Sequence, residues 1–186
     1  ARGRSVGKAA QKGWLAAQLA SGGCSCGQDA LEGHEGLGCT QTDEALVGEA
    51  REGSGEGYEI TGTYFKYHSA CYDTQSSIEA ALKIRAAHDI DPSAIERIVI
   101  EVEAESMNVC GIPNPKTGHE GKFSLRYTTA LALSGADTGA TESYYDGVVN
   151  DPAMVALYEK VTVVPKEGMG TKFGDVTVHL NDGTVL

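Results

Sequence analysis

The feature that most constrains the fold is a glycine-rich, acidic stretch near the N-terminus. Of the chain's 24 glycines, ten lie between residues 22 and 57. Glycine has more backbone freedom to lose on folding than any other residue, so this density favours loop over helix or strand. Residues 28–59 also carry nine acids against a single base, Arg51. We therefore expect most of residues 21–57 to be a loop that separates a short N-terminal part from the rest.

The N-terminal part predicts a helix. The first 20 residues carry four basic residues and no acid. Such a basic start also occurs in transit peptides, but Trp14, Leu15 and Leu19 recur at helical spacing after Gly7. We expect them to form the buried face of a helix.

Beyond residue 57 the sequence mixes helix and strand signals. Apolar periodicity and end signals predict helices over 76–88, 123–133 and 152–160, and strands over 97–103, 161–164 and 175–180. A capping box at 76–79 opens the first helix, and Pro165 closes the second strand. This order predicts an α+β fold, a small antiparallel or mixed sheet with helices on one face.

The end of the chain predicts a hairpin. Asn181-Asp182-Gly183 is a tight-turn signal, and residues 184–186 begin a return strand. Because the sequence stops three residues into that strand and does not begin with Met, we expect a fragment of a longer protein. A natural short edge strand is the alternative.

Composition excludes several classes of protein. The formal charge of −11 disfavours nucleic acid as a partner. The sequence holds no apolar run long enough to span a membrane, so we expect no membrane association. Five cysteines, an odd number, argue against a secreted disulfide framework and favour a cytoplasmic location.

The glycine-rich stretch holds one candidate metal site, formed by Cys24, Cys26, His34 and Cys39. Thiolates and imidazole are ligands that zinc prefers, although this spacing matches no common zinc module. The alternative is a set of unpaired loop cysteines. A metal-stapled interaction module is the binding-protein hypothesis that depends on this cluster.

A second cluster precedes the helix predicted at residue 76. Residues 65–74 include Lys66, His68 and Cys71, a cation, an imidazole and a thiol beside a helix N-terminus. Such a group can bind a carboxylate and move a proton. The alternative is a capped helix whose preceding strand packs Phe65 and Tyr67 into a core.

A third cluster opens the helix predicted over 123–133. Ser124, Arg126 and Tyr127 follow a Gly/Pro loop and can face a cleft, where arginine binds carboxylates through two hydrogen bonds. The alternative is an amphipathic helix with a surface arginine.

Six stretches together resemble the 2-methylcitrate dehydratase family (MmgE/PrpD), which includes cis-aconitate decarboxylase and iminodisuccinate epimerase. In order they are GKAAQKG (7–13), LEG (31–33), YFKYHSAC (64–71), IEAAL (78–82), KFSLRY (122–127) and VTVHLNDG (176–183). The family fold joins a large helical domain to an α+β lid, with the active site between them. The resemblance implies that residues 1–57 end the helical domain and 58–186 form the lid, truncated in its last hairpin. The family's enzymes are more than twice as long and their N-terminal helices, which supply an aspartate and histidines to the site, have no counterpart here.

The resemblance also implies a chemistry without cofactor or metal. A proton leaves a carbon next to a carboxylate of a hydroxy di- or tricarboxylate, and dehydration, decarboxylation or epimerisation follows. Lys66 and Arg126 would bind the substrate's carboxylates, and Tyr127 with His68 or Cys71 would carry protons. The full-length parent would be a homodimer.

Two positions depart from the family pattern. Gln75 and Ser5 stand where the family usually has histidine, and neither side chain titrates near neutral pH. The alternatives to a working lyase or isomerase fragment are therefore a catalytically inactive lid remnant and the metal-stapled interaction module.

Overall fold

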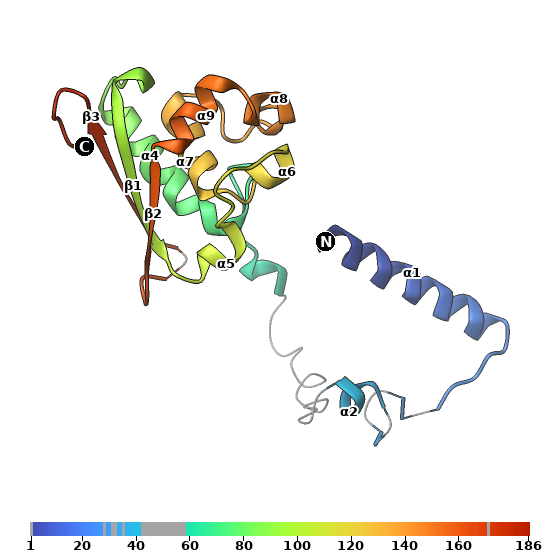
Figure 1. Cartoon of the computed structure of the whole chain (residues 1–186). Coiled ribbons are helices and arrows are strands. Elements are labelled where there is room, and N and C mark those ends of the chain that lie inside the picture. Colours follow the sequence, from blue (N-terminus) through green and yellow to red (C-terminus); the bar gives the residue numbers. More distant parts are fainter. Residues whose placement is uncertain (1, 28, 31–32, 35, 42–58, 171) are drawn as a thin grey trace. The chain divides into compact units, whose positions relative to one another are not determined.

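The computed structural model (Figure 1) describes all residues except 1, 28, 31–32, 35, 42–58 and 171. The chain divides into two compact units, Ala1–Thr63 and Tyr64–Leu186. Residues 42–57, a large part of the stretch expected to be loop, lie outside the described residues.

The described part of the first unit contains helices joined by turns and coil. Its elements are α1 (Arg2–Ser21), α2 (Leu37–Gln41) and the short 3₁₀ helix η1 (Glu59–Gly62). The predicted N-terminal helix is confirmed, but its buried face is wrong, because Trp14, Leu15 and Leu19 are 66%, 50% and 51% exposed. These side chains meet solvent instead of a packed partner. Within the stretch expected to be mostly loop, the structure describes the five-residue helix α2.

The second unit, Tyr64–Leu186, contains both helices and strands. Its elements, in chain order, are η2 (Tyr72–Thr74), α4 (Gln75–Ala87), η3 (Pro92–Ala94), β1 (Ile95–Glu103), α5 (Ser106–Cys110), α6 (Gly118–Gly121), α7 (Leu125–Ser134), η4 (Glu142–Tyr144), α8 (Asp146–Val149), α9 (Pro152–Glu159), β2 (Val161–Lys166) and β3 (Gly174–Leu180).

The three strands form one mixed sheet in the order β2-β1-β3. β1 runs parallel to β2, with Ile98 opposite Val161, and antiparallel to β3, with Ile98 opposite Val178. The α+β prediction is confirmed. The prediction that Pro165 ends its strand is wrong, because β2 continues to Lys166. β2 is an edge strand, where the missing N–H of proline is tolerated.

Helices α4, α7 and α9 lie on one face of this sheet (Figure 1). Along β1, the fully or almost fully buried residues Ile98, Ile100 and Val102 alternate with more exposed ones, so one face of the strand packs under the helices. Helix α7 is the innermost element, with every residue from Tyr127 to Leu133 buried, which confirms the predicted buried helix.

The helix starts follow the predicted end signals with one exception. Asp151 accepts hydrogen bonds from the backbone of Ala153 and Met154 at the start of α9, as an N-cap does. The capping box predicted at 76–79 is wrong. Helix α4 begins one residue earlier, after Thr74, whose side chain makes no cap bond.

The predicted C-terminal hairpin is confirmed. Gly183 has a φ of +88°, which glycine adopts without strain. Beyond it the chain returns along β3, and the backbones of Val178 and Leu186 exchange two hydrogen bonds of 2.9 Å.

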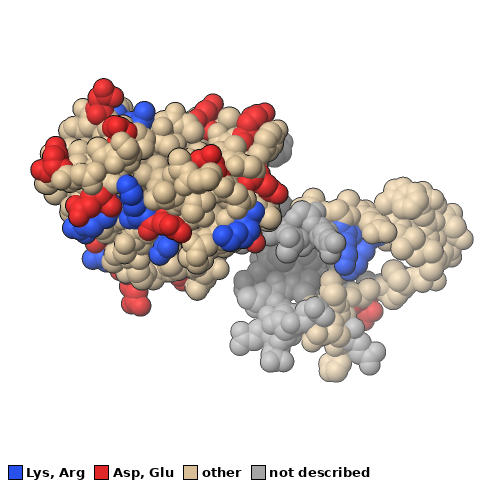
Figure 2. Space-filling model, turned by 45° about the horizontal axis from the view of Figure 1, so that its top comes forward, with Lys and Arg blue, Asp and Glu red and all other residues tan. Residues whose placement is uncertain are grey.

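Within the described residues, no helix combines the length and apolarity needed to cross a bilayer. Figure 2 shows acidic and basic side chains interspersed over the larger unit on the face in view.

Candidate functional site

The segment from Tyr64 to Cys71 is exposed to solvent in its first half and mostly buried in its second. Tyr64, Phe65 and Tyr67 are exposed, with Phe65 at 86%, and Lys66 between them is exposed as well. His68 and Cys71, by contrast, are each only 7% exposed. The alternative that a strand packs Phe65 and Tyr67 into a core is wrong, because no strand forms here and both rings are exposed. Lys66 therefore lies on an open surface next to a buried, ordered turn.

The His68 ring is held at both nitrogens. Its Nε2 lies 3.0 Å from Oε1 of Glu79 on α4, and its Nδ1 lies 2.7 Å from Oγ1 of Thr138, in the loop after α7. A carboxylate only accepts and a hydroxyl can donate, so a ring protonated at Nε2 satisfies both contacts. Glu79 and Thr138 thus fix the orientation of the imidazole. No local sequence signal marks Thr138, and Glu79 stands out in the sequence only as the last residue of the predicted capping box.

The side chain of Gln75 hydrogen-bonds the turn that precedes α4. Its Oε1 accepts from the backbone N–H of His68 at 3.3 Å, and its Nε2 donates to the carbonyl oxygens of His68 at 3.3 Å and Cys71 at 3.2 Å. The amide thereby ties the turn over 68–71 to the first turn of α4. This geometry shows why α4 starts at Gln75: its side chain bonds the turn that precedes the helix.

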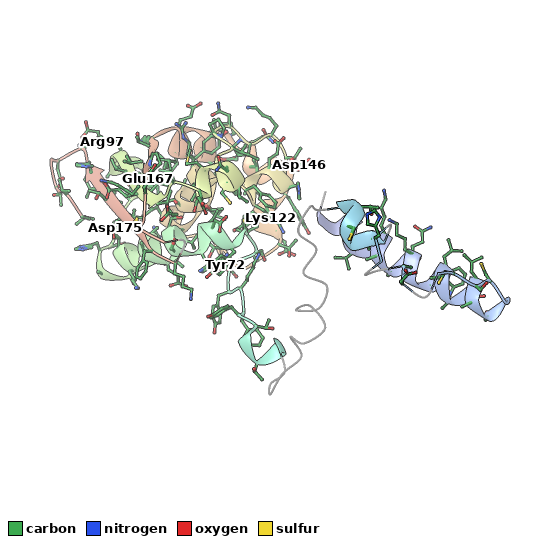
Figure 3. The ribbon with its side chains drawn as sticks, turned by 90° about the horizontal axis from the view of Figure 1, so that it is seen from below. Tyr72, Arg97, Lys122, Asp146, Glu167 and Asp175 are labelled. Carbon is green, nitrogen blue, oxygen red and sulfur yellow. The ribbon has the colours of Figure 1, made fainter. Side chains whose placement is uncertain are left out.

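Cys71 is fixed by the loop that leads into α7. Its backbone N–H donates to the carbonyl oxygen of Lys122 at 2.9 Å. Figure 3 shows Tyr72, the residue after Cys71, close to Lys122. The Nζ of Lys122 lies 5.1 Å from the ring centroid of Tyr144, in cation–π geometry. The second sequence cluster is therefore joined through its backbone to the residues that lead into the third.

Tyr127 lies on the innermost helix and is fully buried. Its hydroxyl donates to the carbonyl oxygen of Ser143, and its ring meets the edges of Tyr144 and Tyr158 at centroid distances of 5.9 and 6.3 Å. Burial raises the pKa of Tyr127 to about 12, because the phenolate would lose its hydration. Its hydroxyl points into the unit, and no open cleft borders it among the described pockets.

A polar and aromatic chain connects Tyr127 to His68. The Tyr127 ring packs on Tyr144, and the Tyr144 hydroxyl donates to the carbonyl oxygen of Thr138 at 3.1 Å. Thr138 in turn contacts the His68 ring through its own hydroxyl. Burial also raises the pKa of Tyr144, with the neighbouring Tyr127 and Asp137 adding to the effect. These tyrosines therefore stay protonated at neutral pH.

Arg126 points elsewhere. It is partly exposed and lines a small hollow of about 120 Å³ with Thr162 and Val163 of β2 and with Cys110. Consecutive helix residues are about 100° apart around the axis, so Arg126 and Tyr127 occupy different faces of α7. The structure does not bring Arg126 to the pocket or contacts of His68.

A larger hollow of about 570 Å³ adjoins the histidine's partners. It lies between α4 and the start of β3 and is lined by Gln75, Glu79, Lys83, Lys172 and Asp175, among others. Figure 3 shows Tyr72 and Asp175, which both line it, on the same side of the unit. The lysines are far apart in the sequence, which is why sequence reasoning did not find this site.

The cysteines of the N-terminal cluster do not form a compact site. Cys24, Cys26 and Cys39 are exposed. Among the described residues, which include His34, the group of three potential ligands that converges within 4.8 Å lies at Cys71, Asp73 and Cys110 instead.

Comparison with known families gives one match. A family model described as the MmgE/PrpD C-terminal domain matches residues 68–186, nearly two thirds of the chain. The matched region begins at His68 and includes Cys71, Arg126 and Tyr127, while Lys66 lies two residues before it. A search of the curated proteins found no match.

Proposed function

The chain belongs to the MmgE/PrpD family, and from this membership we propose that it acts on a hydroxy di- or tricarboxylate by removing a proton next to a carboxylate. The family includes dehydratases and isomerases, and the unit Tyr64–Leu186 would be the lid side of the site. The observation that carries the proposal is the buried His68 ring. It opens the matched region and is held at both nitrogens, beside an exposed lysine.

The first requirement of this chemistry is a cation for the substrate's carboxylates. A proton next to a carboxylate is weakly acidic, since removing it adds negative charge to an anion, and fixed positive charge stabilises that transition state. Lys66 supports this role because it is exposed on a segment that becomes rigid two residues later. Arg126 remains a weaker candidate, since it lines a separate hollow.

The second requirement is a proton carrier. His68 fits because its ring orientation is fixed, and a positioned acid or base contributes roughly 10²–10⁴ in rate. The side chain of Glu79 is 53% exposed, so it can move away from Nε2 when a substrate arrives, whereas Thr138 is buried and holds Nδ1. The ring nitrogen that would face substrate is then Nε2. It donates a proton in the tautomer described above, and it takes one up only when the ring's own proton lies on Nδ1, where Oγ1 of Thr138 can accept it.

Tyr127 fits a proton donor better than a base. A pKa of about 12 keeps its hydroxyl protonated at neutral pH. Because that hydroxyl is buried against Ser143, its effect on the substrate would pass through Tyr144 and Thr138 to His68. Cys71, held by its backbone next to His68, is the alternative carrier.

The test measures incorporation of solvent deuterium at the carbon next to a carboxylate, in substrate or product, across a panel of hydroxy di- and tricarboxylates. This readout covers dehydration, decarboxylation and epimerisation alike. On the native-length polypeptide, we expect His68→Gln to lower kcat by roughly 10²–10⁴ and Lys66→Ala to act mainly on KM. The matched controls are His88→Gln and Lys116→Ala, which change exposed residues of the same types.

Two results would contradict the proposal. Unchanged deuterium incorporation in both His68→Gln and Lys66→Ala would show that neither residue takes part in the reaction. Citrate binding that survives Lys66→Ala but is lost in Lys83→Ala and Lys172→Ala would move the carboxylate site into the 570 Å³ hollow. Nuclear magnetic resonance shifts during a citrate titration distinguish the two surfaces directly.

A further inference from the structure

Two buried cysteines and an aspartate converge at the base of the turn that holds His68. Cys71 directly precedes η2, Asp73 lies within η2, and Cys110 is the last residue of α5. The two sulfur atoms and a carboxylate oxygen all lie within 4.8 Å of one another. Nothing in the sequence pairs Cys110 with the other two, since it lies almost 40 residues further along.

We propose that Cys71, Asp73 and Cys110 form a binding site for a thiophilic divalent cation of the Zn²⁺ type. Zinc binds thiolate at about 2.3 Å and carboxylate oxygen at about 2.0–2.2 Å in a tetrahedron, which places neighbouring ligand atoms about 3.5–3.8 Å apart. The observed separations, within 4.8 Å, need to close by about 1.3 Å at most.

The backbone at Cys71 is already fixed for this role. Its N–H donates to Lys122, and its carbonyl oxygen accepts from the Thr74 hydroxyl at 2.8 Å and from the Gln75 amide at 3.2 Å. Outer contacts of this kind orient metal ligands and strengthen binding. Cys110 lies at the end of α5, which packs against η2. The three proposed ligands therefore come from two adjoining elements.

The donor set favours a soft cation over Mg²⁺ or Ca²⁺. Two sulfur donors select zinc-like metals, whereas hard cations require an oxygen shell. Cys110 is fully buried and Cys71 nearly so, while Asp73 is partly exposed, which gives an ion a route from solvent. Three protein ligands leave one position of the tetrahedron for water or an anion.

This site is distinct from the predicted N-terminal cluster. Cys24, Cys26 and Cys39 are exposed and do not converge in the part of the chain that is described. The proposal also stands independently of the activity proposed above, because its readout is metal binding.

The experiment uses Co²⁺ as the probe, since tetrahedral cobalt thiolates absorb strongly in the ultraviolet and visible. The metal-free chain, kept reduced with a phosphine, carries serine at residues 24, 26 and 39, so that Cys71 and Cys110 are its remaining thiols. We expect one Co²⁺ per chain, with a thiolate charge-transfer band that Zn²⁺ abolishes by displacement. The matched control keeps the three exposed cysteines and carries serine at 71 and 110, and it should show no such band.

Ligand variants then assign the atoms. Cys110→Ser should weaken binding by more than the roughly 10–100-fold that loss of an outer contact costs. Because Cys110 is buried and its variant can fail to fold, Asp73→Asn at the partly exposed position provides a second test, with an expected loss of about 10-fold. Asp175→Asn is its control, and circular dichroism checks that each variant is folded.

Three outcomes would overturn the proposal. They are the absence of a charge-transfer band at one equivalent of Co²⁺, a band that appears in the control with the exposed cysteines instead, and unchanged affinity in a folded Asp73→Asn. A Cys71–Cys110 disulfide without metal uptake by the reduced chain would likewise contradict it.

Discussion

The two units of this chain treat their apolar side chains in opposite ways. In the unit Tyr64–Leu186, large apolar residues of β1 and α7 such as Ile98 and Leu131 are 0% exposed. In α1 of the other unit, Trp14 and Leu15 are at least half exposed although they sit at helical spacing. Apolar periodicity therefore predicted a helix correctly in both units, and it predicted burial correctly in one.

The difference between the two units shows that apolar periodicity predicts a helix but does not by itself predict burial. A helical repeat of apolar residues shows that one face can be covered, but whether it is covered depends on a partner surface. Unit Tyr64–Leu186 supplies its own partner surface, because a three-stranded sheet lies under α4, α7 and α9. We infer that this unit carries a cooperative core of its own.

The sharpest test of this comparison exchanges one leucine in each unit for alanine. Leu131→Ala removes a fully buried side chain from α7 and should lower the free energy of unfolding by about 2–5 kcal/mol, through lost transfer energy and the cavity left behind. Leu15→Ala, in the half-exposed face of α1, should change it by less than about 0.5 kcal/mol. Urea unfolding followed by circular dichroism measures both. Equal losses would show that α1 belongs to the same core.

The glycines of the second unit offer a smaller test of its packing. A Cβ at Gly118 would overlap the backbone oxygen of Tyr144, so α6 must move away from η4 to accept Gly118→Ala. Overpacking of this kind costs about 1–3 kcal/mol, and contact with rigid backbone favours the upper end. Gly147→Ala is the control, because its Cβ would meet nothing within 4 Å. Thermal melts of the two variants that coincide would contradict the tight packing of α6.

Much of the fold could be predicted because its signals are local. Asp151 before Pro152 placed the start of α9, and Asn181-Asp182-Gly183 placed the hairpin turn. Local signals mispredicted the ends of helices and strands where contacts with residues outside the element determine those ends. Helix α4 begins at Gln75 because that side chain bonds the turn over 68–71, and Pro165 fits within β2 because the strand lies at the sheet edge.

The candidate site was predictable only in part, for the same reason. The stretch 66–71 stood out as a dense polar cluster, and the structure brings its backbone against the loop before α7. Thr138 contacts His68 across 70 residues of sequence, and Cys110 approaches Cys71 across almost 40. No spacing rule connects residues so far apart in the chain.

A still smaller effect tests the buried tyrosines at high pH. Burial raises the pKa of Tyr127 from 10.0 to about 12, so between these values the native state keeps a proton that the unfolded chain has lost. The stability due to this proton is complete below pH 10 and is lost as the pH rises towards 12. The free energy of unfolding should fall by at most about 1.4 kcal/mol per pH unit for each such group.

The measurement is urea unfolding at intervals from pH 9 to 11.5. Tyr127→Phe removes one group, so its stability should fall less steeply with pH, and Tyr145→Phe, at an exposed tyrosine, should leave the slope unchanged. Parallel slopes for the native chain and Tyr127→Phe would show that solvent reaches the Tyr127 hydroxyl. A reachable hydroxyl would in turn make Tyr127 a direct proton donor, not a residue that acts through Tyr144.

The smallest expected effect is optical and uses the chain's single tryptophan. Trp14 lies in α1 and is 66% exposed, so its emission should resemble that of hydrated indole before and after unfolding. In one urea titration, the far-ultraviolet circular dichroism should then show the cooperative transition of Tyr64–Leu186 while the emission maximum of Trp14 barely moves. Iodide should quench Trp14 nearly as well in the native chain as in urea. A cooperative red shift that coincides with the dichroism transition would mean that the apolar face of α1 is covered in solution, and the contrast between the two units would then fail at its most sensitive residue.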